Sequence, residues 1–547
     1  PADPDVTTLT SPGTVYSEAV IHVKQGESLE TIKQVAIFTS QPWDSDNPLE
    51  AAVDLAEGST SFAGMKNDSE AGWKKIWEKT DIMIRGDRLA QKLIRMHLYH
   101  LMASYSPHNA HFDASIAARG LHGEAYRGHI FWDELFILPL YFIHFPDAAK
   151  AALMYRYLRL DEAREYARAH GYSGAMFPWQ SGSSGREETQ VVHLNPVTGK
   201  WGPDHSSLQR HVSLAVAFNT WNYYFHTGDL EFLSEYGAEM FLEICRFWAS
   251  KARFDPGTGR YSIDRVMGPD EFHEKYPGVK KGGLRDNAYT NIMTAWALEK
   301  APRIMQALHP EVEEKLKRKV NLEEDELTLW NKISHNLRIP VRDDIIAQYD
   351  GYFDLKELDW EYYRKKYGNI YRMDRLLKAE GLSADDFKVS KQADTLMTFY
   401  VLSVQEVTEI LENMNYRLSD DYLAKNLEYY LKRTSHGSTL SRVVHAHLAN
   451  MAGKKKLSFE LYMDALTSDY HDIQGGTTGE GIHTGVMAGT ILVALHSYAG
   501  LDLSGDVPKF DPKLPDHWRS VAFRFTFQGI RYKCEVYPRK LHIMQEN

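Results

Sequence analysis

The stretch Ser435-His-Gly-Ser-Thr-Leu-Ser441 leads directly into an apolar helical segment, Thr439 to Met451, and this arrangement recurs along the chain. Further short segments rich in glycine, hydroxyl, histidine, aromatic and carboxylate side chains lie before or at predicted helices, at residues 126–134, 177–180, 267–273, 388–394 and 475–483. A toroid of helices collects alternate helix N-termini at one end. Free backbone N–H groups and the positive end of each helix dipole suit that end to hydroxyls and anions. The pattern therefore predicts a pocket at one end of a helical toroid.

Hydrophobic periodicity divides the chain into four regions. Alternating apolar residues between 14 and 39 predict two or three short strands, and residues 49–80 predict a polar helical connector. Clear helices are expected at 148–170, 231–252, 286–308, 391–402, 439–451 and 483–499, and strands at 521–527 and 532–536. The predicted order is a β fragment (1–48), a helical linker (49–86), a large helical domain (87–500) and a β tail (501–547).

Composition excludes several classes of protein. The 547 residues are 43% apolar and 25% charged, which is typical of a soluble globular protein. The net charge of −11 argues against general nucleic-acid binding. Charged residues and a proline interrupt the most apolar run, Phe131 to Phe145, so no membrane span is predicted. Cys245 and Cys534 are the two cysteines, too few for a disulfide framework, and without a signal peptide the expected location is the cytoplasm.

Glu271 is the sharpest candidate for an acid catalyst. It lies in Gly268-Pro-Asp-Glu-Phe-His273, between a rigid turn and a helical stretch, and aromatic neighbours favour the proton-carrying form of a carboxyl group. The alternative is an ordinary solvated turn carboxylate. His273 with Asp270 and Glu274 lacks the spacing of a known metal site, so no metal is expected.

Residues 435–441 lie in a basic segment of this acidic chain. Between 425 and 456 there are seven lysines and arginines against one acid, Glu428. Hydroxyls, a glycine and a helix N-terminus in such a segment predict a site for a small anion, and phosphate is the expected ligand. The alternatives are that Ser438 caps the helix and that the basic residues form a solvated face.

Two other features carry less information. Residues 475–481 are glycine-rich but lack the lysine and hydroxyl of a phosphate-binding P-loop, so nucleotide binding is not expected. Trp132, Trp179 and Trp201 fit stacking against sugar rings, although any large core also uses such residues.

Six motifs in order resemble glycoside hydrolase family 65, the family of maltose, trehalose and kojibiose phosphorylases and related glucosidases. They are Gly128-His-Ile-Phe-Trp-Asp133, Gly268-Pro-Asp-Glu-Phe-His273, Asn287-Ala-Tyr-Thr-Asn291, Lys391-Gln-Ala-Asp394, His436-Gly-Ser-Thr-Leu-Ser441 and Glu480-Gly-Ile-His483. The resemblance runs from about residue 17 to the C-terminus. It implies a mainly α fold, an (α/α)6 barrel with flanking β segments, and an N-terminal β-sandwich of which residues 1–48 contain only the end.

The resemblance also implies residue roles. Glu271 is expected to be the general acid. Trp132, Asp133, Lys391 and Gln392 are expected around the glucosyl unit, and Ser438, Thr439 and His483 near phosphate. No cofactor is expected, because inorganic phosphate is the co-substrate. The expected partners are a disaccharide and phosphate, and a homodimer is one expected state.

The activity predicted from these residues is inverting phosphorolysis of an α-linked glucose disaccharide to β-glucose 1-phosphate and a free sugar. One catalytic carboxylate suffices, because phosphate replaces the base-activated water of an inverting hydrolase. Gly437, small and uncharged, is expected to leave room for phosphate. The alternatives are an inverting hydrolase of the same family with Glu480 as base, and a carbohydrate-binding protein that has lost catalysis.

Overall fold

The computed structural model describes residues 6–41, 45–58, 61–123, 125–474 and 476–546, in two compact units, 1–75 and 76–547. The first unit contains strands β1 (Val6–Ser11) and β2 (Thr14–Ala19), paired as an antiparallel hairpin, helix α1 (Pro48–Gly58) and the start of helix α2 (Phe62–Thr80). The helices agree with the prediction for 49–80. The described residues between 20 and 41 contain no strand, although two or three strands were predicted over 14–39. Val15 and Ile37 are 72% and 80% exposed, so the alternation here does not mark a buried face.

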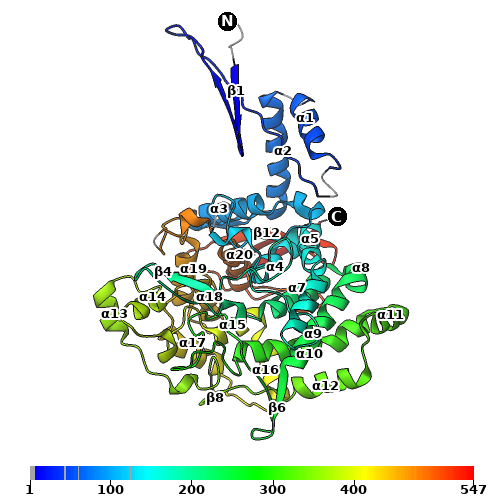
Figure 1. Ribbon diagram of the computed structural model, residues 1–547, viewed down its shortest axis with the longest axis vertical. Coiled ribbons are helices and arrows are strands. Elements are labelled where there is room, and N and C mark those ends of the chain that lie inside the picture. Colours follow the sequence, from blue (N-terminus) through cyan, green and yellow to red (C-terminus); the bar gives the residue numbers. More distant parts are fainter. Residues whose placement is uncertain (1–5, 42–44, 59–60, 124, 475, 547) are drawn as a thin grey trace. The chain divides into compact units, whose positions relative to one another are not determined.

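The second unit is built on a closed ring of six helices: α4 (Glu134–His144), α7 (Val212–Thr227), α10 (Ala288–Ala307), α15 (Asp394–Val401), α18 (Leu440–Met451) and α20 (Thr484–Leu492). Each packs against the next in this order, and α20 packs against α4. Figure 1 labels all six within the helical body. Every residue of α20 is buried, and a Cβ atom at Gly489 would lie 2.7 Å from the Val443 side chain. The missing side chain therefore lets α20 approach α18 closely.

An outer ring of helices covers the inner one: α3 (Arg88–Ser104), α5 (Pro146–Tyr157), α9 (Ala238–Lys251), α16 (Val404–Asn413), α17 (Tyr422–Leu431) and α19 (Lys455–Leu466). Each packs against one or two inner helices, such as α9 against α7 and α10. The outer helices α16 and α17 have a buried and a polar face, as expected for helices between core and solvent. This arrangement confirms the predicted (α/α)6 barrel.

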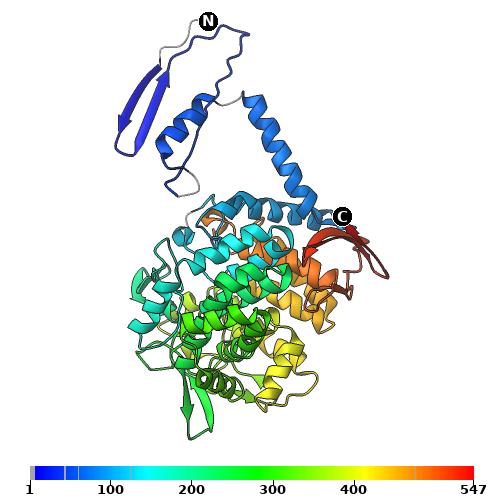
Figure 2. The same ribbon diagram turned by 90° about the vertical axis from the view of Figure 1, so that its right-hand side faces the viewer.

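The remaining helices are short or peripheral: α6 (Leu160–Ala169), α8 (Leu230–Phe232), α11 (Pro310–Val320), α12 (Glu324–Ser334), α13 (Trp360–Tyr367) and α14 (Met373–Ala379). Small two-stranded sheets also occur: β4 (Val192–Asn195) with β5 (Lys200–Pro203), β6 (Ala252–Asp255) with β7 (Arg260–Ile263), β8 (Val341–Arg342) with β9 (Ile345–Ile346), and β10 (Leu501–Asp502) with β11 (Lys509–Phe510). The β6–β7 hairpin (green) projects from the helical body (Figure 2).

The predicted helix at 148–170 is divided into α5 and α6. Between them the Arg159 guanidinium stacks 3.8 Å from the Tyr155 ring centre and pairs with Asp113. Two other predicted helices contain π-helical turns, at Leu233–Gly237 and Val493–Tyr498. A period of 3.6 residues locates such helices but does not reveal these local changes of winding.

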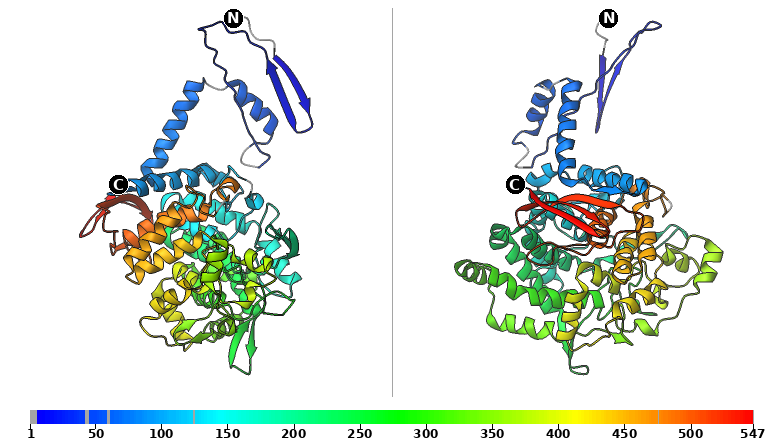
Figure 3. Two further views of the ribbon diagram at one scale, coloured as in Figure 1. Left: turned by 90° about the vertical axis from the view of Figure 1, so that its left-hand side faces the viewer. Right: turned by 180° about the vertical axis from the view of Figure 1, so that it is seen from behind.

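A four-stranded antiparallel sheet, in the order β14-β13-β12-β3, completes this unit. Strands β12 (Ser520–Phe527), β13 (Ile530–Tyr537) and β14 (Lys540–Glu546) lie side by side against the helices (Figure 3), with β12 in contact with α4. The strands predicted at 521–527 and 532–536 are confirmed. Strand β14 was missed because most of its residues are exposed, and β3 (Met83–Arg85) lies inside the predicted linker. Within the described residues, no helix combines the length and the apolar character that crossing a bilayer requires.

Buried histidines should make the fold sensitive to acid. Burial lowers the pKa of His97 and His211 to about 3, and of His144 and His226 to about 4. Among the described residues the pKa is lowered for His97, His100, His144, His193, His205, His211, His226, His436, His445, His447, His483 and His496. Fewer carboxyl groups have a raised pKa: Asp133, Glu274, Asp286, Glu299, Asp394 and Asp469.

We therefore expect the melting temperature to fall as the pH is lowered from about 6.5 to about 4.5. In this range the unfolded chain protonates histidines that the folded chain keeps neutral, so acid favours unfolding. Carboxyl groups with a raised pKa have the opposite effect on stability, because in this pH range the folded chain holds protons that the unfolded chain releases. These groups are fewer than the histidines. Thermal unfolding at matched ionic strength measures the effect. A melting temperature that is constant or higher at pH 4.5 would contradict it.

Candidate active site

Four of the six polar segments, 126–134, 388–394, 435–441 and 475–483, lie at N-termini of the inner helices. The residues that immediately precede α4, α7, α10, α15, α18 and α20 are Asp133, His211, Asn287, Ala393, Thr439 and His483. A Cβ atom at Gly485 would lie 3.1 Å from Asp133 Oδ1, 3.4 Å from the His483 ring and 3.4 Å from Leu440. The N-termini of α4, α18 and α20 therefore meet at one point, as the toroid prediction requires.

The segment Gly268–Glu271 is held by contacts from two inner helices. Asp394 at the start of α15 accepts a hydrogen bond from the Asp270 backbone N–H and another from Asn287 at 2.5 Å. A Cβ atom at Gly268 would lie 1.9 Å from Asp394 Oδ2. Burial and the Asp270 carboxylate raise the pKa of Asp394 well above its usual range. These contacts leave no room for a side chain at residue 268.

Glu271 adopts a left-handed backbone conformation, with φ of +63°. Such a conformation is uncommon for a residue other than glycine and is stabilised only where the surroundings fix it. Its carboxylate accepts a hydrogen bond of 2.7 Å from Lys391 Nζ, and 29% of its side chain is exposed. Lys391 is anchored in turn, because its backbone N–H donates to Asp270 Oδ1 at 2.8 Å. The pair is thus fixed in position and accessible to a ligand.

Gln392 lies behind this pair. Its side chain is 1% exposed and donates a 2.7 Å hydrogen bond to the Pro269 carbonyl, next to the segment that carries Glu271. Its Oε1 atom is buried without a hydrogen-bond partner in the described part of the chain. In this structure Gln392 positions the Glu271 segment.

Trp132 and Asp133 form the wall at the start of α4. The Trp132 ring lies 4.9 Å from the His211 ring and 6.4 Å from the Trp179 ring, centre to centre, and is 3% exposed. Asp133 is 5% exposed, and its Oδ1 has no hydrogen bond among the described residues. Burial raises the pKa of Asp133 to about 7, with a smaller upward effect from Glu271 and an opposing one from the Arg119 guanidinium. Trp201, the third predicted tryptophan, is 67% exposed on β5.

Ser438 and Thr439 lie directly before α18. Thr439 occupies the N-cap position, yet its side chain makes no capping hydrogen bond, and neither hydroxyl has a hydrogen bond within the described residues. Ser438 therefore does not cap the helix in this structure, contrary to the alternative given above. Gly437 donates its backbone N–H to the Lys391 carbonyl at 3.1 Å, which joins this loop to the Glu271–Lys391 pair. A Cβ atom at Gly437 would lie 2.3 Å from the Tyr371 carbonyl, so close backbone packing explains this glycine.

His483 faces Asp133 across the N-terminus of α20. Its Nδ1 lies 3.7 Å from Asp133 Oδ1 and accepts a hydrogen bond from the Val486 N–H at 3.4 Å, so Nε2 carries the hydrogen. Burial and the nearby Arg119 and Lys391 hold the pKa of His483 well below its usual value. The imidazole is thus neutral and can donate one hydrogen bond.

Three side chains of the basic segment are neutralised by acids. Lys425 pairs with Asp344, Arg433 with Glu357 and Lys454 with Glu428. Arg442 donates to the His436 carbonyl at 3.2 Å. The free hydroxyls and helix ends, more than the basic run, give the loop its suitability for an anion.

The comparisons identify the family. The model of the glycosyl hydrolase family 65 central catalytic domain matches residues 95–492, and that of the family's C-terminal domain matches residues 501–546. The chain belongs to glycoside hydrolase family 65.

Relatives in this family include enzymes with named substrates. The chain is 42% identical to the trehalose 6-phosphate phosphorylase of Lactococcus lactis over 95% of this chain and 66% of that protein. It is 41% identical to an uncharacterised glycosyl hydrolase of Mycobacterium tuberculosis, over 96% of this chain and 40% of that protein. A human-microbiome structure titled as a candidate kojibiose phosphorylase matches with a TM-score of 0.76 and 26% identity, over 92% of this chain and 64% of that one. The chain thus spans two fifths to two thirds of the lengths of these proteins.

Two arginines near the family 65 site were missed by the sequence analysis. Arg119 stacks 5.6 Å from the Tyr126 ring centre and donates to the Gly481 carbonyl at 2.9 Å. The Arg372 guanidinium is close enough to Glu271 for their charges to interact. Arg119 and Arg372 lie in irregular segments without a motif, so only the folded chain brings them to the site.

Two other sequence candidates are Glu480 and His273. Glu480 is exposed, and its side chain makes no hydrogen bond in the described part of the chain. His273 donates to the Phe387 carbonyl and pairs with Asp270 at 2.5 Å, which raises the pKa of His273 to about 9 although burial opposes it. The described residues contain no cluster of metal-binding side chains, and Gly475 lies outside them.

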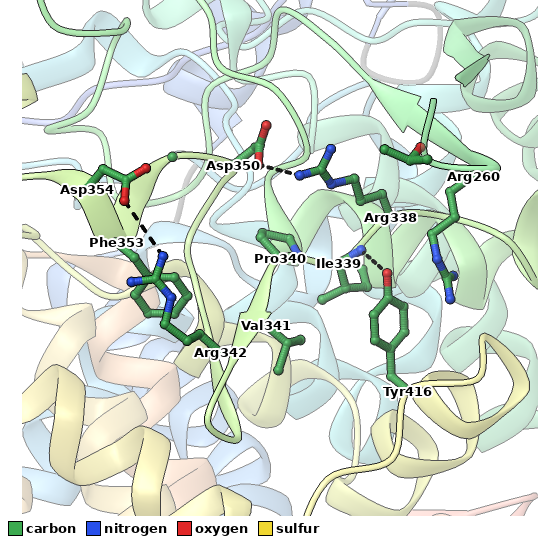
Figure 4. A pocket seen from close by; sticks show the side chains of 12 residues that line it. Arg260, Arg338, Ile339, Pro340, Val341, Arg342, Asp350, Phe353, Asp354 and Tyr416 are labelled. Carbon is green, nitrogen blue, oxygen red and sulfur yellow. Dashed lines mark hydrogen bonds and ion pairs between the residues drawn. The ribbon is translucent and has the colours of Figure 1, made fainter. Parts of the chain in front are cut away.

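A cavity of about 380 Å³ lies elsewhere in the catalytic unit (Figure 4). Its arginines are paired with neighbours, Arg338 with Asp350 at 2.7 Å and Arg342 with Asp354 at 3.7 Å. None of the predicted site residues lines it. We therefore place the candidate active site at Glu271 and not in this cavity.

Proposed function

We propose that this chain catalyses inverting phosphorolysis of an α-linked glucose disaccharide, with release of β-glucose 1-phosphate and a free sugar. The observation that carries the proposal is the fixed Glu271–Lys391 pair. A backbone hydrogen bond joins this pair to the loop before α18, in which the Ser438 and Thr439 hydroxyls are unpaired in the described part of the chain. Relatives named as phosphorylases of trehalose 6-phosphate and kojibiose support it.

In this proposal Glu271 is the general acid. Its carboxyl group donates a proton to the glycosidic oxygen as the bond to the anomeric carbon breaks. Trp132 stacks against the glucosyl ring, and Asp133 and Lys391 bind its hydroxyl groups. The unpaired Oδ1 of Asp133 is available for such a hydrogen bond. Gln392, as the support of the Pro269 carbonyl, keeps Glu271 in its left-handed conformation.

Inorganic phosphate is the co-substrate and the nucleophile. Ser438 and Thr439 donate hydroxyl hydrogen bonds to it, and the neutral His483 donates from Nε2. The N-termini of α18 and α20 add the positive ends of their dipoles. Phosphate attacks the anomeric carbon on the face opposite the departing oxygen, so a single displacement inverts that carbon.

Hydrolysis is the second candidate. It requires a base that activates water, and the sequence analysis assigned Glu480 to that role. The exposed position of Glu480, without a bond that orients it among the described residues, favours phosphorolysis. The third candidate, a binding protein without catalysis, is opposed by the intact Glu271–Lys391 pair.

The proposal is tested by incubating the protein with a panel of α-linked glucose disaccharides, with and without inorganic phosphate. We expect glucose 1-phosphate to form only in the presence of phosphate. Equal release of glucose without phosphate would identify a hydrolase. Binding without turnover of any disaccharide would identify a binding protein.

The phosphate loop gives a further prediction. The double change Ser438→Ala and Thr439→Ala removes two hydroxyl donors without changing charge. Each hydrogen bond to an anion contributes about 1.5–3 kcal/mol, so the KM for phosphate should rise at least ~10-fold. The KM for the disaccharide should change much less. An equal rise for both substrates would indicate a structural role for the hydroxyls.

A further inference from the structure

Helix α14 brings arginines to the Glu271 side of the site. The segment that leads into this helix is anchored at Tyr371, because Ser435 Oγ donates a 3.0 Å hydrogen bond to the Tyr371 carbonyl and the Arg442 guanidinium lies 4.9 Å from the Tyr371 ring centre. At the other end of this segment, Asn195 donates a 3.3 Å hydrogen bond to the Arg375 carbonyl. The backbone that carries Arg372 and Arg375 is therefore tied to the loop before α18 and to the β4–β5 hairpin.

The two arginines differ in their partners. Arg372 is bound in a fork by Asp374, with Nε–Oδ1 at 3.0 Å and Nη2–Oδ2 at 2.7 Å. Arg375 has no hydrogen bond or ion pair from its side chain among the described residues, and its Nε atom is buried. A buried guanidinium N–H without an acceptor is unfavourable unless a ligand supplies one. Arg375 therefore has an unfilled position for an anion.

The other charged groups around Arg375 leave this position positive. Burial and Arg372 lower the pKa of Arg375, while Asp374 and Glu480 act in the opposite direction. Asp374 is already engaged by Arg372, and Glu480 is exposed. His193, on strand β4, has a pKa lowered by burial. The positive charges of Arg372, Lys378 and Arg375 lower it further, and the Asp204 carboxylate raises it. Arg372 is paired with Asp374 and Lys378 with Glu274, whereas Arg375 has no ion pair in the described part of the chain.

We propose that Arg375, supported by Arg372, binds a phosphate ester on the leaving sugar, so that the substrate is an α-glucosyl sugar phosphate. This inference rests on the proposed function, because it defines the leaving-group side by the general acid Glu271. The acid protonates the oxygen that stays with the leaving sugar. Arg372 lies within charge interaction of that acid.

Two further arguments favour the leaving sugar over the co-substrate. The co-substrate phosphate already has donors in Ser438, Thr439 and His483, and its path of attack is opposite to the Glu271 side. A guanidinium pair is also the preferred partner of a phosphate monoester, because its N–H groups match the oxygens geometrically. The Lactococcus relative, 42% identical, is named for a disaccharide that carries such a phosphate.

The test compares phosphorolysis of trehalose 6-phosphate and trehalose by the wild-type protein, Arg375→Gln and Lys378→Gln. Lys378 is the matched control, because it is on the same helix but pairs with Glu274 at 3.5 Å. The wild type should prefer trehalose 6-phosphate. Arg375→Gln should lower kcat/KM for trehalose 6-phosphate by about 10–100-fold. The decrease in kcat/KM for trehalose should be smaller by a factor of at least ~10. Lys378→Gln should change both by less than about threefold.

Calorimetry with glucose 6-phosphate and glucose provides a readout that does not depend on turnover. The wild type should bind glucose 6-phosphate more tightly, and Arg375→Gln should remove the preference. No preference in the wild type, or an equal loss for both sugars, would overturn the inference. A raised KM for inorganic phosphate alone would assign the arginines to the co-substrate and also overturn it.

Preserved phosphorolysis of trehalose would then leave the proposed function standing, whereas tight binding of glucose 6-phosphate without phosphorolysis would overturn the proposed function alone.

Discussion

Replacement of Glu271 by glutamine is expected to lower turnover of an unactivated disaccharide by about 10²–10⁴-fold or more, with the fold intact. Glutamine keeps the shape of the side chain, and its carbonyl oxygen still accepts the hydrogen bond that Lys391 now donates at 2.7 Å. It cannot supply a proton to the glycosidic oxygen. The measurement is the initial rate of phosphate-dependent release of the acceptor sugar, with circular dichroism to verify the fold.

Two controls sharpen this prediction. α-Glucosyl fluoride, whose leaving group departs without a proton, should lose much less activity in the same variant. Glu480→Gln tests the other carboxylate and should retain most phosphorolysis, because the proposed reaction requires no base. Near-normal turnover of an unactivated disaccharide by Glu271→Gln would exclude Glu271 as the acid.

The change Gly268→Ala is expected to have the second-largest effect, a loss of turnover of about 10²-fold together with a loss of stability of about 1–3 kcal/mol. The new Cβ atom would lie 1.9 Å from Asp394 Oδ2 and 2.3 Å from Asn287 Nδ2. Because Asp394 is buried at the start of α15 and bonded to Asn287, the segment must move instead, and Glu271 moves with it. Melting temperature and kcat measured on the same preparation separate the two effects.

Gly202→Ala is the matched control. A Cβ atom at Gly202 would meet nothing within 4 Å, so the same chemical change should leave melting temperature and kcat close to wild type. If Gly268→Ala behaved like Gly202→Ala, the Gly268–Glu271 segment would not be fixed by Asp394 and Asn287.

Much of the fold followed from the sequence, because the inner helices are long, apolar and preceded by distinctive polar segments. Thr439 to Met451 and Asp286 to Leu308 were predicted within two residues of the observed α18 and α10. The strands expected between 20 and 41 depended on alternation alone. Alternation predicts a strand only where one face is buried, and residues such as Ile37 are exposed. Strand β14 was missed for the related reason that its burial pattern is weak.

The site was predicted less completely than the fold. Motifs predicted Glu271, Asp133, Lys391 and His483 as site residues, because each lies beside the N-terminus of an inner helix or in a glycine-containing turn. The 2.7 Å bond between Lys391 and Glu271 joins residues 120 positions apart and has no signature in sequence. Arg375 also has no signature in sequence, because the feature that marks it is a buried Nε atom without a hydrogen-bond partner in the described part of the chain. Such features depend on tertiary contacts that local patterns do not encode.

The configuration of the first product tests the central claim most directly. Proton NMR of the early reaction of an α-linked glucose disaccharide, or its 6-phosphate, should show β-glucose 1-phosphate that forms only with inorganic phosphate. The reaction should reverse when the acceptor sugar is added. A retaining enzyme would need a second carboxylate about 5–5.5 Å from the acid. Detection of α-glucose 1-phosphate as the first product would contradict the account, as would β-glucose released at the same rate without phosphate.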